Sequence, residues 1–189
     1  FQHWRDYLTM YGLGDRLGLD LPGEIRGNVP TVEDYNKDYG ERRWKASTIL
    51  TLGIGQDKLI VTPLQQANMM AAIANGGWWY DPHVVKHVEG NDEILENYLF
   101  RHESEFDPSI FPPVIDGLRL VVESGTGQMA QVPGIEVCGK TGTAENPHGE
   151  DHSVFVAFAP KDNPKIAIAA IVENSGWGGT WRSEEHTSE

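Results

Sequence analysis

Two nearly unbroken apolar runs dominate the hydrophobic pattern of the chain. They cover residues 154–159 and 166–172, and a short segment with a proline at each end, residues 160–164, lies between them. Continuous apolar runs of this length are typical of strands in a sheet that helices cover on both faces. The short connection suits a hairpin, so we predict that both runs and a preceding strand over residues 135–144 form one antiparallel sheet.

Helical patterns precede these strands. Aromatic and leucine residues recur at helical spacing over residues 1–11, before a loop over residues 12–31, and a second apolar face runs from Asp107 to Ser124. Residues 62–65 form a capping-box pattern that begins a helix reaching about residue 75, followed by a strand over residues 78–88. The second apolar face comprises Val114, Ile115, Leu118, Val121 and Val122. Helices combined with an antiparallel sheet indicate an α+β fold.

Composition narrows the class of protein. The chain has 189 residues, of which 39% are hydrophobic and 23% charged, which is typical of a single globular core. Its formal net charge of −13 argues against a nucleic-acid partner. No stretch approaches the roughly 20 apolar residues of a membrane-spanning helix. Cys138 is the only cysteine, and its place in an apolar strand predicts a small core residue rather than a reactive thiol.

Lys140-Thr141-Gly142-Thr143 is the main candidate for substrate binding. It places an ammonium, two hydroxyls and a backbone N–H in a row on an extended segment, which suits a substrate carboxylate and a developing oxyanion. Gly142 would let a substrate lie close alongside as an added strand. A K-T-G triplet is one signature of the active-serine enzymes that react with penicillin. The alternative is a solvated lysine on an edge strand with ordinary threonines.

The same residues complete a second motif. Residues 134–141 satisfy G-x-x-x-x-G-K-[ST], the loop that holds phosphates in nucleotide hydrolases. That loop must follow a buried strand and open a helix. The preceding residues 128–133 are polar and end in proline, and Gly142, Pro147 and Gly149 follow the lysine. We therefore favour a strand over a nucleotide-binding loop.

Histidine and aromatic clusters offer weaker candidates. Residues 148–152, His-Gly-Glu-Asp-His, contain metal-ligating types, but we interpret them as a solvated turn because no partner completes a known ligand spacing. His83 and His87 are expected to lie well separated on one face of a strand and receive no function. The aromatic residues 78–80 could form a carbohydrate platform, yet packing in a strand explains them better.

Several motifs occur together and in order along the chain. They are residues 12–24 (GLGDRLGLDLPGE), 53–56 (GIGQ), 61–65 (VTPLQ), 71–77 (AAIANGG), 125–127 (GTG), 139–144 (GKTGTA) and 158–160 (FAP). Over residues 1–181 the chain resembles the transpeptidase domain of class B penicillin-binding proteins, and most closely the elongation type, penicillin-binding protein 2. The resemblance implies the penicillin-binding protein and serine β-lactamase fold, an antiparallel sheet covered by helices.

The resemblance also implies a reaction. In the family a serine activated by a lysine attacks a D-alanyl-D-alanine stem peptide, and the acyl group passes to an amine to cross-link peptidoglycan. Lys140 would attract the substrate carboxylate, Thr141 and Thr143 would hydrogen-bond it or the equivalent group of a β-lactam, and the Thr143 N–H would belong to the oxyanion hole. No cofactor or metal is implied. The implied setting is the periplasmic side of the bacterial inner membrane, with an upstream anchor and a partner glycosyltransferase of the elongation machinery.

Two family motifs are absent from this chain. No serine is followed by lysine three residues later, and none by asparagine or aspartate two residues later. The chain therefore resembles the C-terminal part of a transpeptidase domain, without its N-terminal part and last helix. We expect it to be inactive alone, with the apolar faces of residues 154–159 and 166–172 partly uncovered.

The last eight residues differ in character. Residues 182–189, RSEEHTSE, match the translation of a common sequencing-library adapter, so we expect an artefact, with a natural polar tail as the alternative.

Two other functions share the implied fold. One is a serine β-lactamase or a β-lactam sensor, and the other is a non-catalytic binding module. The segments 12–24 and 62–77 favour the transpeptidase, because both resemble penicillin-binding proteins.

Overall fold

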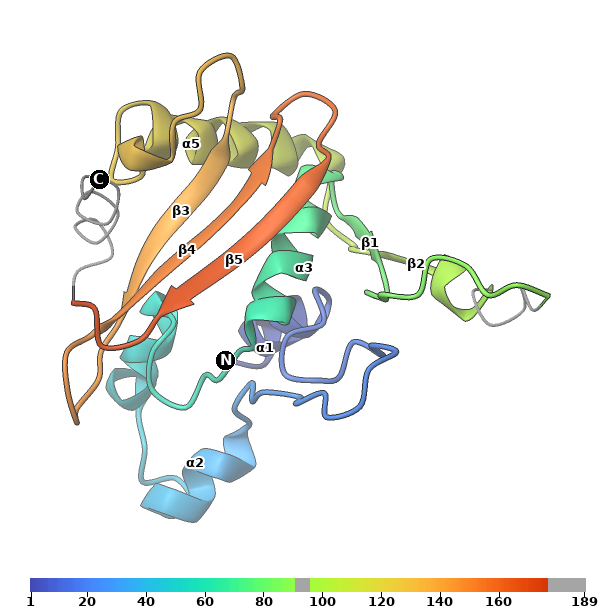
Figure 1. Ribbon diagram of the computed structural model, residues 1–189. Helices are drawn as coiled ribbons and strands as arrows, with labels where there is room; N and C mark the ends of the chain where they lie inside the picture. Colours follow the sequence, from blue (N-terminus) through green and yellow to red (C-terminus); the bar gives the residue numbers. More distant parts are fainter. Residues whose placement is uncertain (91–95, 177–189) are drawn as a thin grey trace. The chain divides into compact units, whose positions relative to one another are not determined.

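The computed structural model describes residues 1–90 and 96–176 (Figure 1). The chain divides into two compact units. The first unit comprises Phe1–Gln65 and Tyr80–Arg101, and the second comprises Gln66–Trp79 and His102–Glu189. The predicted artefact at residues 182–189 lies outside the described residues.

The first unit is built from short helices and loops. Its helices are α1 (Gln2–Thr9), α2 (Val32–Tyr39) and the 3₁₀-helix η1 (Ala46–Ile54). The predicted N-terminal helix is confirmed, and Gly12 follows it with a φ of 77°. Fully buried Tyr35, on α2, packs its ring 5.3 Å from that of Trp44. Aromatic packing therefore supplies much of the core of this unit.

Polar side chains hold the predicted loop over residues 12–31. The Glu24 carboxylate accepts hydrogen bonds from the N–H groups of three successive residues, Leu17, Gly18 and Leu19, at 2.5–3.1 Å. The buried Gln65 amide donates to the carbonyls of Asp15 and Arg26 at 2.6 and 2.9 Å. The segment is thus fixed without belonging to a sheet.

The predicted strand over residues 78–88 is wrong beyond Tyr80. Strand β1 is only Trp78–Tyr80, and it pairs with β2 (Arg101–Glu103); the 3₁₀-helix η2 (Asn97–Leu99) precedes β2. The N–H groups of Val84 and Val85 bond the Asp20 carboxylate at 2.9 and 2.8 Å, which lowers the pKa of Asp20. A carboxylate thus takes the hydrogen bonds that a strand would direct to a neighbour.

Helix α3 (Pro63–Ala74) confirms the capping-box prediction. The Thr62 N–H donates to Gln65 Oε1 at 3.0 Å, and the Gln65 N–H donates to the Thr62 hydroxyl at 3.2 Å. Beyond the helix, Gly77 has a φ of 109°, and an added Cβ would lie 2.5 Å from Ser104 Oγ. Only glycine fits this close turn.

The second unit contains the predicted three-stranded sheet. Strands β3 (Cys138–Ala144), β4 (His152–Ala159) and β5 (Ile166–Val172) are antiparallel in the order β3-β4-β5. Helix α5 (Phe111–Glu123), entered through η3 (Pro108–Ile110), precedes η4 (Gln128–Ala130), and α3 and α5 cover one face of the sheet (Figure 1). The hairpin between β4 and β5 is confirmed. Strand β3 begins later than predicted, because Ile135 instead bridges Val132.

Two apolar clusters form the core of the second unit. One surrounds Met70, Cys138 and Phe158, and the other surrounds Val122, Phe155 and Ala157. Cys138 is fully buried, and this burial raises the pKa of its thiol to about 11, which agrees with a core role.

One expectation about burial is wrong, and a second, that the apolar faces of residues 154–159 and 166–172 are partly uncovered, is confirmed for residues 166–172 and wrong for the centre of residues 154–159. Val114 is 45% exposed, so it does not belong to the buried face of α5. The side chains of Phe155, Ala157 and Phe158 are buried, so β4 is well covered in its central part. Exposure of apolar side chains is confined to β5 within the two strands.

Candidate functional site

Strand β3 presents the predicted substrate-binding residues at the outer edge of the described sheet. Lys140 and Thr143 are exposed, and Thr141 and Gly142 are half-buried. All four residues pair with β4 on one side, from Lys140 opposite Val156 to Thr143 opposite Ser153. The nucleotide-loop hypothesis is wrong, because residues 138–144 form a strand and not a loop that opens a helix.

Two contacts hold the polar groups of this strand. The Lys140 ammonium donates to the Thr141 carbonyl at 2.6 Å. The hydroxyl of Thr126 lies 2.6 Å from that of Thr141. Thr126 belongs to the motif at residues 125–127, but the sequence alone indicated no role for it. Its flanking glycines, directly after a helix, were the signal that could have singled it out.

The two glycines of β3 differ in what surrounds them. A Cβ at Gly139 would lie 2.8 Å from the Phe155 ring and 2.9 Å from the Val156 carbonyl oxygen, so packing requires glycine there. A Cβ at Gly142 would meet only Val154, at an ordinary 3.5 Å. The chain's own packing therefore does not require Gly142, and a demand from outside the chain would explain this glycine.

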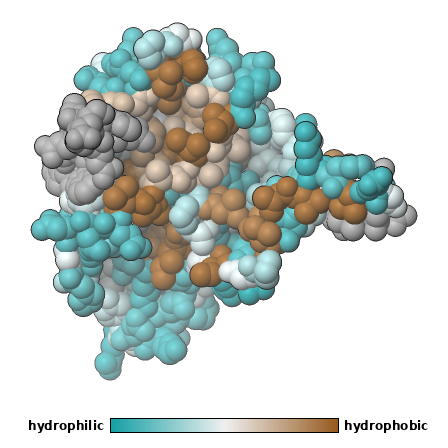
Figure 2. Space-filling view, in the orientation of Figure 1, coloured by the Kyte–Doolittle hydropathy of each residue, from teal (hydrophilic) through white to brown (hydrophobic). Residues whose placement is uncertain are grey.

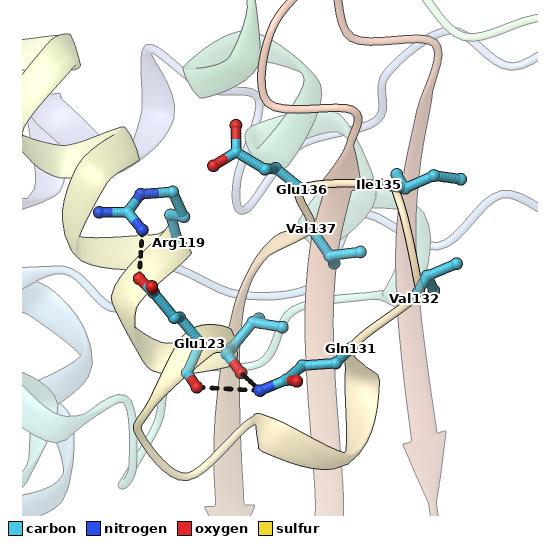
Figure 3. Close-up of a pocket in the computed structure, with 8 residues that line it drawn as sticks. Arg119, Glu123, Gln131, Val132, Ile135, Glu136 and Val137 are labelled. Atoms are coloured by element: carbon cyan, nitrogen blue, oxygen red, sulfur yellow. Dashed lines mark hydrogen bonds and ion pairs between the residues drawn. The ribbon is translucent and has the colours of Figure 1, made fainter.

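A pocket of about 200 Å³ lies beside the end of α5, away from these residues (Figure 3). Its apolar lining comes from Val122, Val132, Ile135 and Val137, with the ion pair of Arg119 and Glu123 at one side. Residues 140–143 do not line it. The pocket therefore lies between α5 and the segment that leads into β3, and it is not part of the candidate site.

The histidine-rich turn joins β3 to β4, as predicted. The Asp151 carboxylate accepts from the Asn146 N–H at 3.1 Å, and His152 Nδ1 accepts from the Asn174 N–H at 3.0 Å. The first bond closes the turn on itself, and the second fastens its end to the residues after β5. Within residues 1–90 and 96–176, no three histidine, cysteine or acidic side chains gather to hold a metal ion.

The aromatic cluster and the histidine pair were the other candidates from the sequence. Trp79 is 6% exposed and stacks on His102 with ring centroids 4.0 Å apart, which confirms packing as its role. His83 and His87 lie outside any strand, so their expected placement on one strand face is wrong.

The chain belongs to the penicillin-binding protein transpeptidase domain family, whose model matches residues 2–187. It is 31% identical to the peptidoglycan D,D-transpeptidase MrdA of Acinetobacter baumannii over 92% of this chain and 28% of that protein. MrdA of Haemophilus influenzae is also 31% identical, over 93% of this chain and 30% of that protein. The chain thus spans less than a third of the length of these relatives.

Solved structures agree with this assignment. Penicillin-binding protein 2 of Pseudomonas aeruginosa, in complex with WCK 5153, superposes with a TM-score of 0.81 and 33% identity over 95% of this chain and 39% of that chain. Penicillin-binding protein 2 of Helicobacter pylori, in a complex with MreC, superposes with a TM-score of 0.80 and 27% identity over 94% of this chain and 33% of that chain. The expected fold and the likeness to penicillin-binding protein 2 are confirmed. Within the described residues, no helix has the length and apolar character needed to span a bilayer.

Proposed function

We propose that this chain forms the substrate-binding part of a peptidoglycan D,D-transpeptidase that also binds β-lactams. Family membership and the names of the relatives support this assignment. The observation that carries it is the row Lys140–Thr143 on an outer strand, in which Lys140 and Thr143 are exposed and an added Cβ at Gly142 would meet only Val154, at an ordinary 3.5 Å. In this proposal the attacking serine and its lysine are supplied by a part of the complete protein outside these 189 residues, which contain no S-x-x-K motif.

Each residue of the row has a proposed role. Lys140 supplies a positive charge for the substrate carboxylate, and the hydroxyls of Thr141 and Thr143 donate hydrogen bonds to the same group. An outer strand directs alternate backbone N–H groups away from its neighbour. We assign the N–H of Thr143 to the oxyanion hole, where such a donor stabilises the charge that develops on the attacked carbonyl.

Gly142 suits a peptide that docks as an additional strand. In this mode main-chain hydrogen bonds along an open sheet edge bind an extended peptide. A side chain at position 142 would crowd such a peptide, whereas within the chain an added Cβ would meet only Val154, at an ordinary 3.5 Å. The stem peptide would therefore lie alongside β3, with its terminal carboxylate close to Lys140.

Partners and location are proposed from the relatives. One solved relative is a complex of penicillin-binding protein 2 with MreC, and another belongs to a peptidoglycan synthase complex that coordinates polymerization and crosslinking. We propose that the complete protein works beside a glycosyltransferase of the elongation machinery. Its domain would lie on the periplasmic side of the bacterial inner membrane, anchored by a segment outside these residues.

Labelling of the complete protein with a fluorescent penicillin tests the function. A covalent band that survives denaturation is expected. Thr143→Val keeps the shape of the side chain and removes its hydroxyl, so acylation should slow by about 10- to 100-fold, as for a lost hydrogen bond to a charged group. Thr143→Ser, which keeps the hydroxyl, is the matched control.

The other outcomes separate the alternatives. Equal acylation of Thr143→Val and the unchanged protein would show that this hydroxyl does not hold the carboxylate. Fast release of hydrolysed β-lactam would identify a serine β-lactamase instead. A complete protein that binds stem peptides without any covalent adduct would be a non-catalytic binding module.

A further inference from the structure

The segment from Ser124 to Gln131 closes the C-terminal end of α5. The last four carbonyls of a helix have no partner within it. Here those of Leu120 and Val121 accept from N–H groups of the segment at 2.9–3.1 Å. The carbonyls of the next two residues accept from the Gln131 side-chain amide at 3.0 and 2.9 Å. All four are thus satisfied by one segment, which is therefore fixed to the helix.

Glycines on both sides of Thr126 lie close to the helix. The N–H groups of Gly125 and Gly127 both donate to the Val121 carbonyl, at 3.1 and 2.9 Å. An added Cβ at Gly125 would lie 2.9 Å from the Cα and carbonyl oxygen of Val121, and one at Gly127 would lie 3.2 Å from that oxygen. A side chain at Gly125 would clash with the helix and one at Gly127 would be tight, and both N–H groups are bonded to it, so the threonine is held between two anchored residues.

The anchored threonine contacts the candidate site directly. Its hydroxyl oxygen is 2.6 Å from that of Thr141, and either group can donate. A hydroxyl carries a single proton and can accept two hydrogen bonds. When Thr141 donates its proton to a ligand carboxylate, it can only accept from Thr126. The bound state therefore fixes the direction of this hydrogen bond, and a donor to the Thr141 oxygen also strengthens the bond that Thr141 donates.

We propose that Thr126 is a positioning residue for substrate recognition. Its hydroxyl donates to Thr141 and directs the Thr141 proton toward the carboxylate of a stem peptide or β-lactam. This role rests on the proposed function, because it requires that Thr141 binds a carboxylate. Thr126 itself acts through Thr141 and need not touch the ligand.

The test measures acylation of the complete protein by a fluorescent penicillin. Thr126→Val should slow acylation by about two- to tenfold, as expected for one neutral hydrogen bond, and Thr126→Ser should restore the rate. In a double-mutant cycle, Thr126→Val should add no further loss to Thr141→Val. A methyl ester of the same β-lactam, which lacks the negative charge, should acylate the Thr126→Val variant and the unchanged protein at equal rates.

Other results would overturn the role. Additive losses in the cycle, or equal slowing with the methyl ester, would indicate a general effect on structure. A Thr126→Val variant that acylates normally would contradict the inference while leaving the proposed function intact. Failure of the unchanged protein to acylate would instead remove the proposed function and this role with it. Thermal unfolding separates misfolding from these outcomes, and we expect the midpoint of the unchanged protein for the two Thr126 variants because Thr126 is exposed.

Discussion

The two outer strands of the described sheet, β3 and β5, have the same position in the topology and opposite surface chemistry. Both flank β4. The exposed groups of β3 are the ammonium of Lys140 and the hydroxyl of Thr143. Those of β5 are apolar, with Ile166 59% and Ile168 39% exposed. One edge can therefore bind a polar ligand by directed hydrogen bonds, whereas the other offers only surface that water solvates poorly.

The difference separates an edge whose side chains suit ligand binding from an edge whose apolar side chains favour burial against another surface. Figure 2 shows apolar side chains gathered over the sheet face that carries β4 and β5. An outer strand with exposed isoleucines favours association unless something covers it. An outer strand with an exposed lysine and threonine is expected to resist that association, and β3 is the edge on which we propose that an extended peptide docks. The residues on each strand, more than its position, decide which edge can serve as a site.

The largest expected effect is that the 189-residue chain alone does not react covalently with penicillin. If β3 supplies recognition only, these 189 residues should form no covalent adduct with a fluorescent penicillin, because they contain no S-x-x-K nucleophile motif. The measurement is a denaturing gel of the labelled chain, with the complete protein as the positive control. A labelled band from the chain itself would place a nucleophile within it and contradict the assignment of β3 to recognition.

Alanine at the two glycines of β3 should separate packing from binding. In the complete protein, Gly139→Ala should lower the free energy of unfolding by about 1–3 kcal/mol, as expected for overpacking against Phe155 and the Val156 carbonyl. Gly142→Ala should change it by less than about 1 kcal/mol, yet slow acylation. Urea unfolding and penicillin labelling measure the two effects. Equal losses of stability at both positions would show that packing determines both glycines.

Much of the second unit could be predicted from sequence because its signals are local. Apolar runs identified β4 and β5, and the capping box at Thr62 fixed the start of α3. The strand predicted over residues 78–88 failed, because Asp20, far away in the sequence, binds the N–H groups of Val84 and Val85. Such a long-range hydrogen bond leaves no periodic signal in the segment that it reshapes.

The candidate site was predictable only in part. The candidate residues of β3 were predicted from their motif, and the structure places them on an outer strand, while their roles stay a prediction. The need for glycine at position 139 comes from the Phe155 side chain on the neighbouring strand. The contact of Thr126 with Thr141 joins residues on different elements across 15 positions. Neither could be derived without the register of the strands and the close fit of the loop on α5.

The buried beginning of β3 gives a smaller, pH-dependent prediction. Burial raises the pKa of the Cys138 thiol from 9.0 to about 11. Between these values the unfolded chain has lost the proton that the folded chain keeps, so stability is full below pH 9 and falls as the pH rises toward 11. The expected slope is at most about 1.4 kcal/mol per pH unit.

Urea unfolding of the complete protein between pH 8 and 11 measures this slope, with Cys138→Ala as the control. The variant should show a shallower decline. Some decline should remain, because burial and Asp57 also raise the pKa of Tyr35. Identical slopes in both proteins would contradict the assignment of a neutral, buried thiol to the folded state.

The smallest effect on folding is expected at β5, where substitutions should alter association instead. Ile166→Lys and Ile168→Lys replace exposed apolar side chains with charged ones, so each should change the free energy of unfolding by less than about 0.5 kcal/mol. Charged residues on an outer strand oppose edge-to-edge pairing. In the 189-residue chain, size-exclusion chromatography should therefore show less self-association, and a hydrophobic dye should bind less. Thr143→Lys on β3 is the matched control, because it adds the same charge to an edge that is already polar. If that control reduced association as much as the β5 variants, net charge would be responsible, and the contrast between the two edges would lose its explanation.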